Sequence, residues 1–254
     1  MKKYYSVIMQ VLSFVGVAAI LLSCRDEQIF FQDVVPTEGA RLKFVHSASD
    51  ASGVHFYVND SRITSGAASG TALNYSISFP GTNYSALTPG SLAVKIAVPA
   101  TATVAETVLV TSTISTENNN YYTVALAGIS GSYEAILLND DVSAIAYDGK
   151  AYVRFVNLIH NSTNKVNVIA KLGTAAPVTI AQNVPYKQFI TFTGMDPGDY
   201  TITLVDAVNT STVLATASAT VRNITGNKVY TLFARGQIGK TGALVPVLDR
   251  MVNR

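Results

Sequence analysis

The residue types that carry out most protein chemistry are scarce in this sequence. It contains three histidines, His46, His55 and His160, and a single cysteine, Cys24. Nucleophilic catalysis needs a base beside the nucleophile. However, no Gly-x-Ser-x-Gly turn, glycine-rich phosphate loop or His-Glu-x-x-His zinc motif occurs. The sequence therefore assigns no residue to catalysis, to a cofactor or to a metal, and it predicts that the protein is not an enzyme.

His46 is the histidine most open to a functional interpretation. It shares a strand phase with Leu42 and Phe44, which predicts that its side chain points inward. Asn157 occupies the matching position in the second half of the chain. A polar side chain at the same strand end in both halves predicts a structural hydrogen bond to the following turn, with metal ligation as the alternative. His55 falls on the polar phase of its own strand, which predicts a solvated side chain.

A short acidic stretch, Asn139-Asp140-Asp141, is the remaining candidate for a metal site. It carries the oxygen ligands that calcium prefers, but it lacks the alternating acidic positions of a calcium loop. A turn at the end of a module is the favoured interpretation, and calcium binding is the alternative.

Cys24 follows a segment with the features of an export signal. Lys2 and Lys3 precede the apolar run Val7–Leu22, which at 16 residues is shorter than the roughly 20 residues of a spanning helix. The end of this run, Leu21-Leu22-Ser23-Cys24, resembles the lipobox of bacterial lipoproteins. The resemblance implies a signal peptide at residues 1–23, a lipidated tether at 24–39, and a membrane partner reached through a lipid such as palmitate on Cys24. An uncleaved anchor with an incidental cysteine is the alternative.

The residues after the cysteine predict a destination. Arg25 stands where an aspartate would resemble an inner-membrane retention signal, so the resemblance implies an outer-membrane lipoprotein. The pair Asp26-Glu27 resembles the acidic tag that carries some lipoproteins to the outer face of that membrane. The cell surface is therefore favoured over the periplasmic face.

The charge of the exported part excludes one class of function. The chain has 18 basic and 16 acidic residues, and removal of Lys2 and Lys3 with the signal leaves 16 of each. Nucleic-acid binding needs a basic face, so no nucleic-acid partner is expected. Tryptophan is absent, which removes the indole that many sugar sites use, although 13 tyrosines are available instead.

The sequence repeats itself in its second half. Three collinear segments match at offsets of 111, 108 and 108 residues, namely 40–46 with 151–157, 88–90 with 196–198, and 122–128 with 230–236. An internal repeat at nearly constant spacing indicates a duplicated structural unit. We therefore expect one module at residues 40–142 and a second at 150–254.

Within each copy, apolar residues recur at every second position, as in a β-strand. This alternation runs through residues 40–46, 54–58, 166–171 and 213–221. In the first run Phe44 lies on one face, with Lys43 and Val45 on the other. Turn pairs such as Pro89-Gly90 separate the runs. The pattern predicts an all-β chain with a β-sandwich in each module.

The opening of the first copy resembles a known family. Residues 42–50 followed by 54–60 resemble the start of domain of unknown function 4397, which has a basic-aromatic strand, a His-Ala-Ser-Pro-Asp-like turn and a strand ending in Asn-Gly. Pro89-Gly90 and the strand Tyr122–Gly128 match later features of that family. The resemblance covers residues 40 to about 140 well.

The second copy, residues 151 to about 250, resembles the family more weakly, because Asn157-Leu158-Ile159 replaces the His-Ala-Ser-like turn. In the first copy Ser49 stands in place of the usual proline and His55 in place of the usual aspartate. The resemblance implies an exported, immunoglobulin-like sandwich, often in tandem and often on a lipoprotein. It implies no activity and therefore no catalytic residue.

Three functions stay open at this point. A surface binding or adhesive module with an unknown protein or glycan ligand is favoured, because a lipid tether places the loops of paired sandwiches away from the membrane. The alternative is a structural subunit of an envelope complex or fimbria-like assembly that joins its partner by strand donation. A hydrolase is least favoured because the sequence lacks a paired base and nucleophile.

Overall fold

The computed structural model describes residues 38–64 and 71–254, and Glu38–Arg254 form one compact unit. The predicted signal peptide at residues 1–23, Cys24, and the predicted tether as far as residue 37 lie outside the described residues. Within the described part of the chain, no helix has the length and apolar character needed to cross a membrane.

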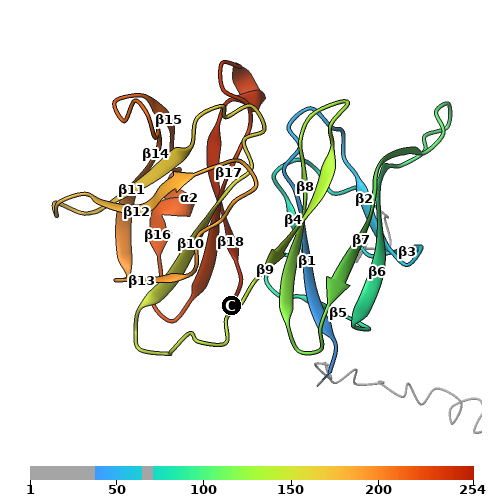
Figure 1. Cartoon of the computed structure of the whole chain (residues 1–254), viewed down its shortest axis with the longest axis horizontal. Helices are drawn as coiled ribbons and strands as arrows, with labels where there is room; N and C mark the ends of the chain where they lie inside the picture. The colour runs from blue at the N-terminus through green and yellow to red at the C-terminus, as the bar shows by residue number, and fades with distance from the viewer. Residues whose placement is uncertain (1–37, 65–70) are drawn as a thin grey trace, which may run out of the picture. The chain divides into compact units, whose positions relative to one another are not determined.

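The first half of this unit contains two β-sheets (Figure 1). In one sheet the strand order is β4 (Ser78–Phe79), β1 (Ala40–His46), β8 (Tyr121–Ala127) and β9 (Glu134–Asn139), and β5 (Ser85–Leu87) also pairs with β1. In the other the order is β3 (Ser61–Arg62), β2 (His55–Val58), β6 (Gly90–Val98) and β7 (Thr107–Thr116). β1 and β8 run parallel, and the other neighbours run antiparallel.

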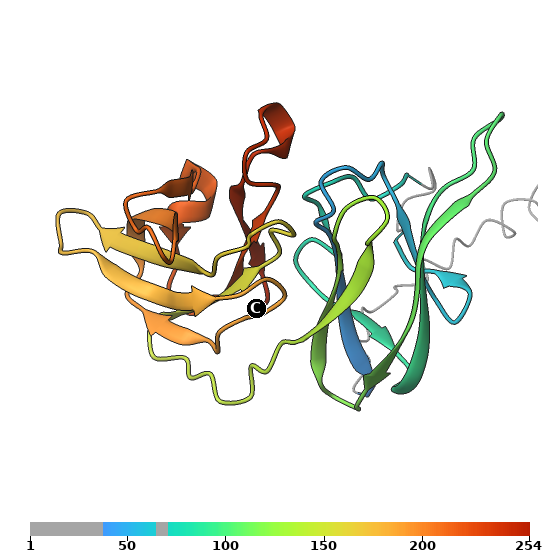
Figure 2. The same cartoon turned by 45° about the horizontal axis from the view of Figure 1, so that its top comes forward.

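The second half repeats this arrangement. One sheet has the order β13 (Thr193–Met195), β10 (Ala151–Asn157), β17 (Val229–Arg235) and β18 (Val247–Val252), with β10 parallel to β17. The other has the order β12 (Val178–Val184), β11 (Val166–Leu172), β14 (Gly198–Asp206) and β15 (Val213–Thr216), and β16 (Asn223–Ile224) also pairs with β14. The connection between β17 and β18, dark red in Figure 2, holds the short 3-10 helix η1 (Gly242–Leu244).

Each half is a sandwich because its two sheets enclose a separate apolar core. The first core contains Phe44 from β1 and Phe56 from β2, and the second contains Phe155 from β10 and Ile202 from β14. Both Phe44 and Phe155 are completely buried, as alternation within the two matching strands predicts. The predicted all-β, sandwich-like fold class is confirmed, whereas the domain boundaries at residues 142 and 150 stay predictions.

A third apolar cluster lies between the two halves. From the first half, β1, β8 and β9 contribute to this cluster, and from the second half, β17, β18 and the end of β10 contribute. The residues are Val45, Ala125, Ala127 and Leu138 from the first half and Val156, Leu158, Phe233 and Met251 from the second. The face of β1 opposite Phe44 is therefore buried as well, and Lys43 is completely inaccessible on it.

One predicted strand is shorter than its alternation indicates. The run 213–221 forms β15 only as far as Thr216, and a four-residue helix, α2 (Ala219–Arg222), follows. Ala217 and Val221 are nevertheless both buried. Residues four apart share a face in a helix as well as in a strand, so this spacing did not distinguish the two conformations and the prediction of a continuous strand was wrong.

Candidate functional site

A fully buried ion pair joins the two halves of the chain. The guanidinium of Arg154 in β10 pairs with the carboxylate of Asp140, which directly follows β9, and their side chains are 1% and 0% exposed. Nη1 of Arg154 also donates to the carbonyl oxygen of Asn139 at 2.7 Å, and Nε donates to Oγ1 of Thr231 at 2.9 Å. All three guanidinium nitrogens are therefore engaged by protein acceptors.

The carboxylate of Asp140 is equally well satisfied. Its Oδ2 accepts hydrogen bonds from the hydroxyls of Tyr84 at 2.7 Å and Thr123 at 2.6 Å, and from Nδ2 of Asn253 at 3.3 Å. Burial and the neighbouring carboxylate raise the pKa of Tyr84, so the phenol stays a proton donor. These contacts hold the two halves together.

The acidic stretch therefore has a role that the sequence did not predict. Asp140 belongs to the buried ion pair, a role that the expected turn at the end of a module did not include. The carboxylate of Asp141 accepts hydrogen bonds from the backbone and hydroxyl of Ser143, which lower its pKa. Among residues 38–64 and 71–254, no group of three or more His, Cys, Asp or Glu side chains could hold a metal.

Lys43 is the second buried cation at this contact. Its Nζ donates to the carbonyl oxygen of Val252 at 2.7 Å and lies 4.8 Å from the ring centre of Tyr84. Burial lowers the pKa of Lys43 to about 8, and the charge of Asp140 opposes this shift only in part. The charge of Lys43 is therefore poorly compensated, because the carboxylate of Asp140 pairs with Arg154 instead.

His46 has the structural role expected from its position. Its Nε2 lies 2.9 Å from the carbonyl oxygen of Ser52 in the following turn, and burial lowers its pKa. The matching Asn157 likewise bonds to the turn that follows its strand, through Oδ1 to the backbone N–H of Ile159 and through Nδ2 to Oγ of Ser162. The predicted hydrogen bond to the turn is confirmed.

The prediction of a solvated His55 was wrong, because this side chain is only 2% exposed. Its ring meets the ring of Tyr57 edge-on at 6.3 Å between centroids. Two side chains hold Tyr57 in place. Its hydroxyl donates a hydrogen bond to Oε2 of Glu106 at 2.8 Å, and Nζ of Lys95 lies 4.0 Å from the centre of its ring. Long side chains from β6 and the β6–β7 loop therefore cover a strand face that the alternation pattern assigned to solvent.

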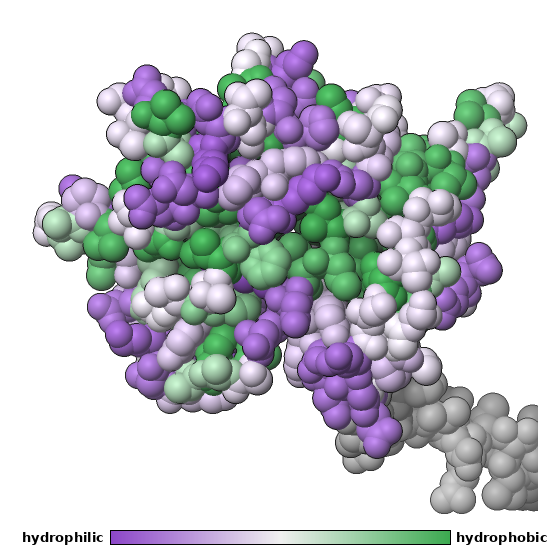
Figure 3. All heavy atoms as spheres, viewed as in Figure 1, coloured by the Kyte–Doolittle hydropathy of each residue, from purple (hydrophilic) through white to green (hydrophobic). Residues whose placement is uncertain are grey.

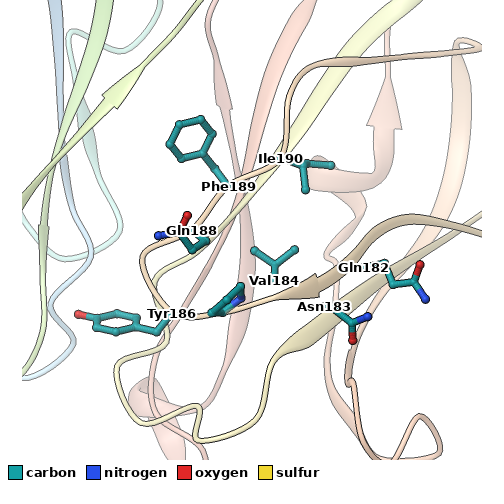
Figure 4. A pocket seen from close by; sticks show the side chains of 8 residues that line it. Gln182, Asn183, Val184, Tyr186, Gln188, Phe189 and Ile190 are labelled. Carbon is teal, nitrogen blue, oxygen red and sulfur yellow. The ribbon is translucent and has the colours of Figure 1, made fainter.

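A surface groove follows the segment that connects β12 to β13. Figure 4 shows this segment doubling back, with Gln182 and Asn183 on the outgoing arm and Gln188 and Phe189 on the returning arm. The amide side chains of all three polar residues are exposed. The ring of Phe189 is 41% exposed. Across the face of the molecule drawn in Figure 3, apolar side chains reach the surface among polar ones. This groove is the candidate binding site.

Backbone contacts hold the doubled-back segment to the end of β10. The N–H of Lys187 donates to the carbonyl of Asn157 at 2.8 Å, and the N–H of Asn157 donates to the carbonyl of Gln188 at 3.1 Å. Nδ2 of Asn157 donates to the carbonyl of Val184 at 3.1 Å. Asn183 and Lys187 have φ values of 53° and 68°, a conformation that residues other than glycine seldom adopt. Surrounding contacts that enforce such a backbone make the groove well defined.

The charged groups next to the groove are occupied by protein partners. Tyr186 points to the side of the segment opposite to Gln182 and Asn183 (Figure 4) and donates to Oε1 of Glu134 at 2.9 Å. Nζ of Lys187 lies 2.5 Å from Oε2 of the same carboxylate. Burial and Glu134 together raise the pKa of Tyr186. The guanidinium of Arg154 lies 5.5 Å from the ring centre of Phe189, so the buried ion pair also supports the ring of the groove.

The sequence analysis did not single out this segment. Residues 183–190, Asn-Val-Pro-Tyr-Lys-Gln-Phe-Ile, contain a proline with an aromatic residue on either side of Lys187-Gln188. That composition indicates a turn, but the convergence of the two arms depends on hydrogen bonds to Asn157, which lies far away in the sequence.

Comparison with known families gives a match for residues 40–169, to the family described as Domain of unknown function (DUF4397). The chain belongs to this family. The match includes all of the first half and continues through β10 into β11, so it extends beyond the residues near 140 where the sequence resemblance was expected to weaken. No curated protein matches this DUF4397 chain.

Among solved structures, the DUF4397 chain is similar to the crystal structure of CBMbc (family CBM26) from Eubacterium rectale Amy13K in complex with maltoheptaose. The two chains are 12% identical, and the similarity covers 84% of this chain and 95% of the other, with a TM-score of 0.22. A TM-score of this size supports neither a shared fold nor a shared ligand.

Proposed function

We propose that this DUF4397 protein is a lipid-anchored, non-catalytic binding protein of the cell envelope. The observation that carries the proposal is the groove at residues 182–190, which combines an exposed ring with exposed amides on a backbone held by hydrogen bonds. Sites of this kind bind ligands with a few well-placed polar groups beside apolar surface. The rigid support of the groove reduces the entropy that a ligand must overcome.

The non-catalytic part of the proposal is supported by how the ionisable groups are used. The buried carboxylate of Asp140 is paired with Arg154, and the nearby Glu134 is paired with Lys187. His46 and His55 lie on strands of different sheets, β1 and β2. General acid–base catalysis needs such a group within reach of the substrate and free to exchange a proton, and these groups do not meet that requirement.

The anchoring part of the proposal rests on the sequence around Cys24. A thioether-linked diacylglycerol with an additional acyl chain would bury many methylenes, each worth roughly 0.8 kcal/mol. We propose that the lipid holds the protein at the outer membrane, with surface display favoured over the periplasmic face. Fractionation of cells that express the wild type or Cys24→Ala tests this. The wild type should stay with the membrane and incorporate labelled palmitate, and the variant should do neither.

The binding part is tested with purified residues 25–254 on immobilised glycans and envelope proteins. We expect saturable binding to at least one of them, lost in Phe189→Ala and kept in Tyr147→Ala. Tyr147 is a matched control because its ring is 70% exposed outside the groove. Equal binding by all three proteins, or none by the wild type, would contradict the assignment of the groove.

The alternative of a structural subunit has one test of its own. Strand donation leaves a terminal strand available to a partner, whereas β18 pairs with β17 along its whole length. Ladders of high-mass species on gels of envelope fractions would nevertheless favour the structural alternative over a binding role.

A further inference from the structure

The geometry points to a neutral saccharide as the ligand of the groove at residues 182–190. This inference rests on the binding function proposed above and adds the chemical class of the ligand. It follows from three properties of the groove: its hydrogen-bonding groups, the pairing of the charged side chains beside it, and its aromatic ring.

The hydrogen-bonding groups of the groove are carboxamides. Gln182, Asn183 and Gln188 have exposed side chains, and the described structure gives their amide groups no protein partner. In Figure 4 the amide of Gln188 lies beside Phe189, whereas Gln182 and Asn183 point away from that ring on the other arm. Each carboxamide offers two donors and an acceptor oxygen side by side. Sugar hydroxyls also donate and accept at the same atom, so adjacent hydroxyls of one sugar ring can bond to both ends of one amide.

The charged side chains beside the groove, Lys187 and Arg154, are already paired with protein carboxylates. Nζ of Lys187 is held by Glu134, and the guanidinium of Arg154 is buried against Asp140. Recognition of a carboxylate or phosphate generally uses a free arginine or lysine as a charged donor. Breaking either ion pair to bind an anion would leave a carboxylate without its cation. The groove is therefore complementary to an uncharged ligand.

Phe189 supplies a platform for the apolar face of a sugar ring. The face of an aromatic ring is electronegative and attracts the weakly positive C–H groups that line one side of a pyranose. Arg154 lies on one side of this ring at 5.5 Å from its centre, which fixes the ring in place. The groove has a volume of about 570 Å³, within the approximate range of 300–1,000 Å³ for small-ligand sites. A short oligosaccharide therefore fits it.

The first half of the chain does not repeat this site. In the first half, the positions that match Gln188 and Phe189 are Ile77 and Ser78. The carbonyl of Ile77 accepts a hydrogen bond from the backbone N–H of the last residue of β1, and the carbonyl of Gln188 accepts the same bond from the last residue of β10. Likewise Ser78 pairs with Val45 as Phe189 pairs with Val156. The positions that match Gln188 and Phe189 thus lack both the amide and the ring. We expect one saccharide for each chain.

Calorimetric titration of residues 25–254 tests the inference. The probes are hexasaccharides of α-linked glucose, β-linked glucose, β-linked mannose and β-linked galactose, with hexagalacturonate as the acidic comparator. At least one neutral hexasaccharide should bind at one per chain, with an affinity unchanged between 50 mM and 500 mM NaCl. Phe189→Ala should weaken binding at least tenfold and Gln188→Ala about fivefold, while Tyr147→Ala and Ile77→Ala leave it unchanged. Thermal melts confirm that each variant is folded.

The outcomes separate this inference from the binding function. Failure of every neutral hexasaccharide to bind, preference for hexagalacturonate, or neutral binding that Phe189→Ala leaves unchanged would each overturn the saccharide assignment. If an immobilised envelope protein is instead bound through Phe189, the binding function stands and only the ligand class is wrong. If no probe of either kind responds to Phe189→Ala, both proposals are wrong.

Discussion

Lys43 and Arg154 occupy matching positions in β1 and β10, and each donates a hydrogen bond to the last strand of the other half. Nζ of Lys43 donates to the carbonyl of Val252, and Nη1 of Arg154 donates to the carbonyl of Asn139, both at 2.7 Å. Val252 and Asn139 also match, since β18 pairs with β17 in the register in which β9 pairs with β8. The contact between the halves is therefore isologous, as in a symmetric dimer.

The symmetry is broken one residue further along. Asp140 and Asn253 occupy matching positions, and they touch each other, with Nδ2 of Asn253 at 3.3 Å from Oδ2 of Asp140. A carboxylate at both positions would bring two buried like charges together. The amide at Asn253 avoids this and donates to the carboxylate instead.

Asn253→Asp should therefore destabilise the protein at neutral pH. We expect a loss of about 3–5 kcal/mol in the free energy of unfolding, the magnitude of an uncompensated buried charge. The new carboxyl would have a raised pKa, so the loss should shrink as the pH falls and the acid becomes a donor. Urea unfolding at pH 7 and pH 4.5 measures both values. A loss that is equal at the two pH values would show that shape rather than charge is responsible.

The ion pair itself is tested by a double-mutant cycle. Asp140→Asn leaves the guanidinium of Arg154 buried without a charge partner and should cost about 3–5 kcal/mol. Arg154→Met should cost a similar amount because Asp140 is then unpaired. The double variant should cost clearly less than the sum of the two. Additive losses would mean that the two side chains contribute independently.

Lys43 should make stability rise with pH. Burial lowers its pKa in the folded protein to about 8, while the unfolded side chain has a pKa near 10.4. Between these values the unfolded chain binds more protons, so the free energy of unfolding should increase from pH 8 to pH 10, by up to about 3 kcal/mol. Lys43→Met should remove the rise. A flat profile in the wild type would mean that Lys43 keeps its ordinary pKa.

His46→Asn should give a folded but weaker protein. Asn157 already bonds to the corresponding turn of the second half, so the backbone can accommodate an asparagine there. The loss of one hydrogen bond and some packing volume should cost about 1–2 kcal/mol, seen in urea unfolding. If a chelator lowers the melting temperature of the wild type only, His46 binds a metal and its structural role is not the whole account.

Alternation and repetition predicted the strands that form the sandwiches because these are local properties of the chain. The burial of Phe44 and Phe155 and the hydrogen bond of His46 follow from a period of two and from the matching strand ends. Periodicity indicates which residues share a face of a strand, but it does not indicate which other part of the chain packs on that face. Lys43 and His55 lie on faces that other parts of the chain cover, and this cover was not apparent from their own strands.

The candidate site was beyond the reach of sequence patterns for a related reason. The groove depends on Asn157 holding the two arms around Lys187, and on the left-handed conformation of Asn183. Asparagine adopts a positive φ more often than most residues other than glycine, but nothing in the residue type of Lys187 indicates one. Likewise Asp140 finds Arg154 only because two sheets from different halves pack together.

The difference between Asp140 and Asn253 has a consequence for encounters between separate molecules. If two first halves met through this surface, they would place two copies of Asp140 against each other, and two second halves would each bury Arg154 with no acid to receive it. Only unlike halves satisfy both charges, and the covalent link presents them to each other at high effective concentration. The chain thereby encodes a preference for folding onto itself over pairing with neighbouring molecules.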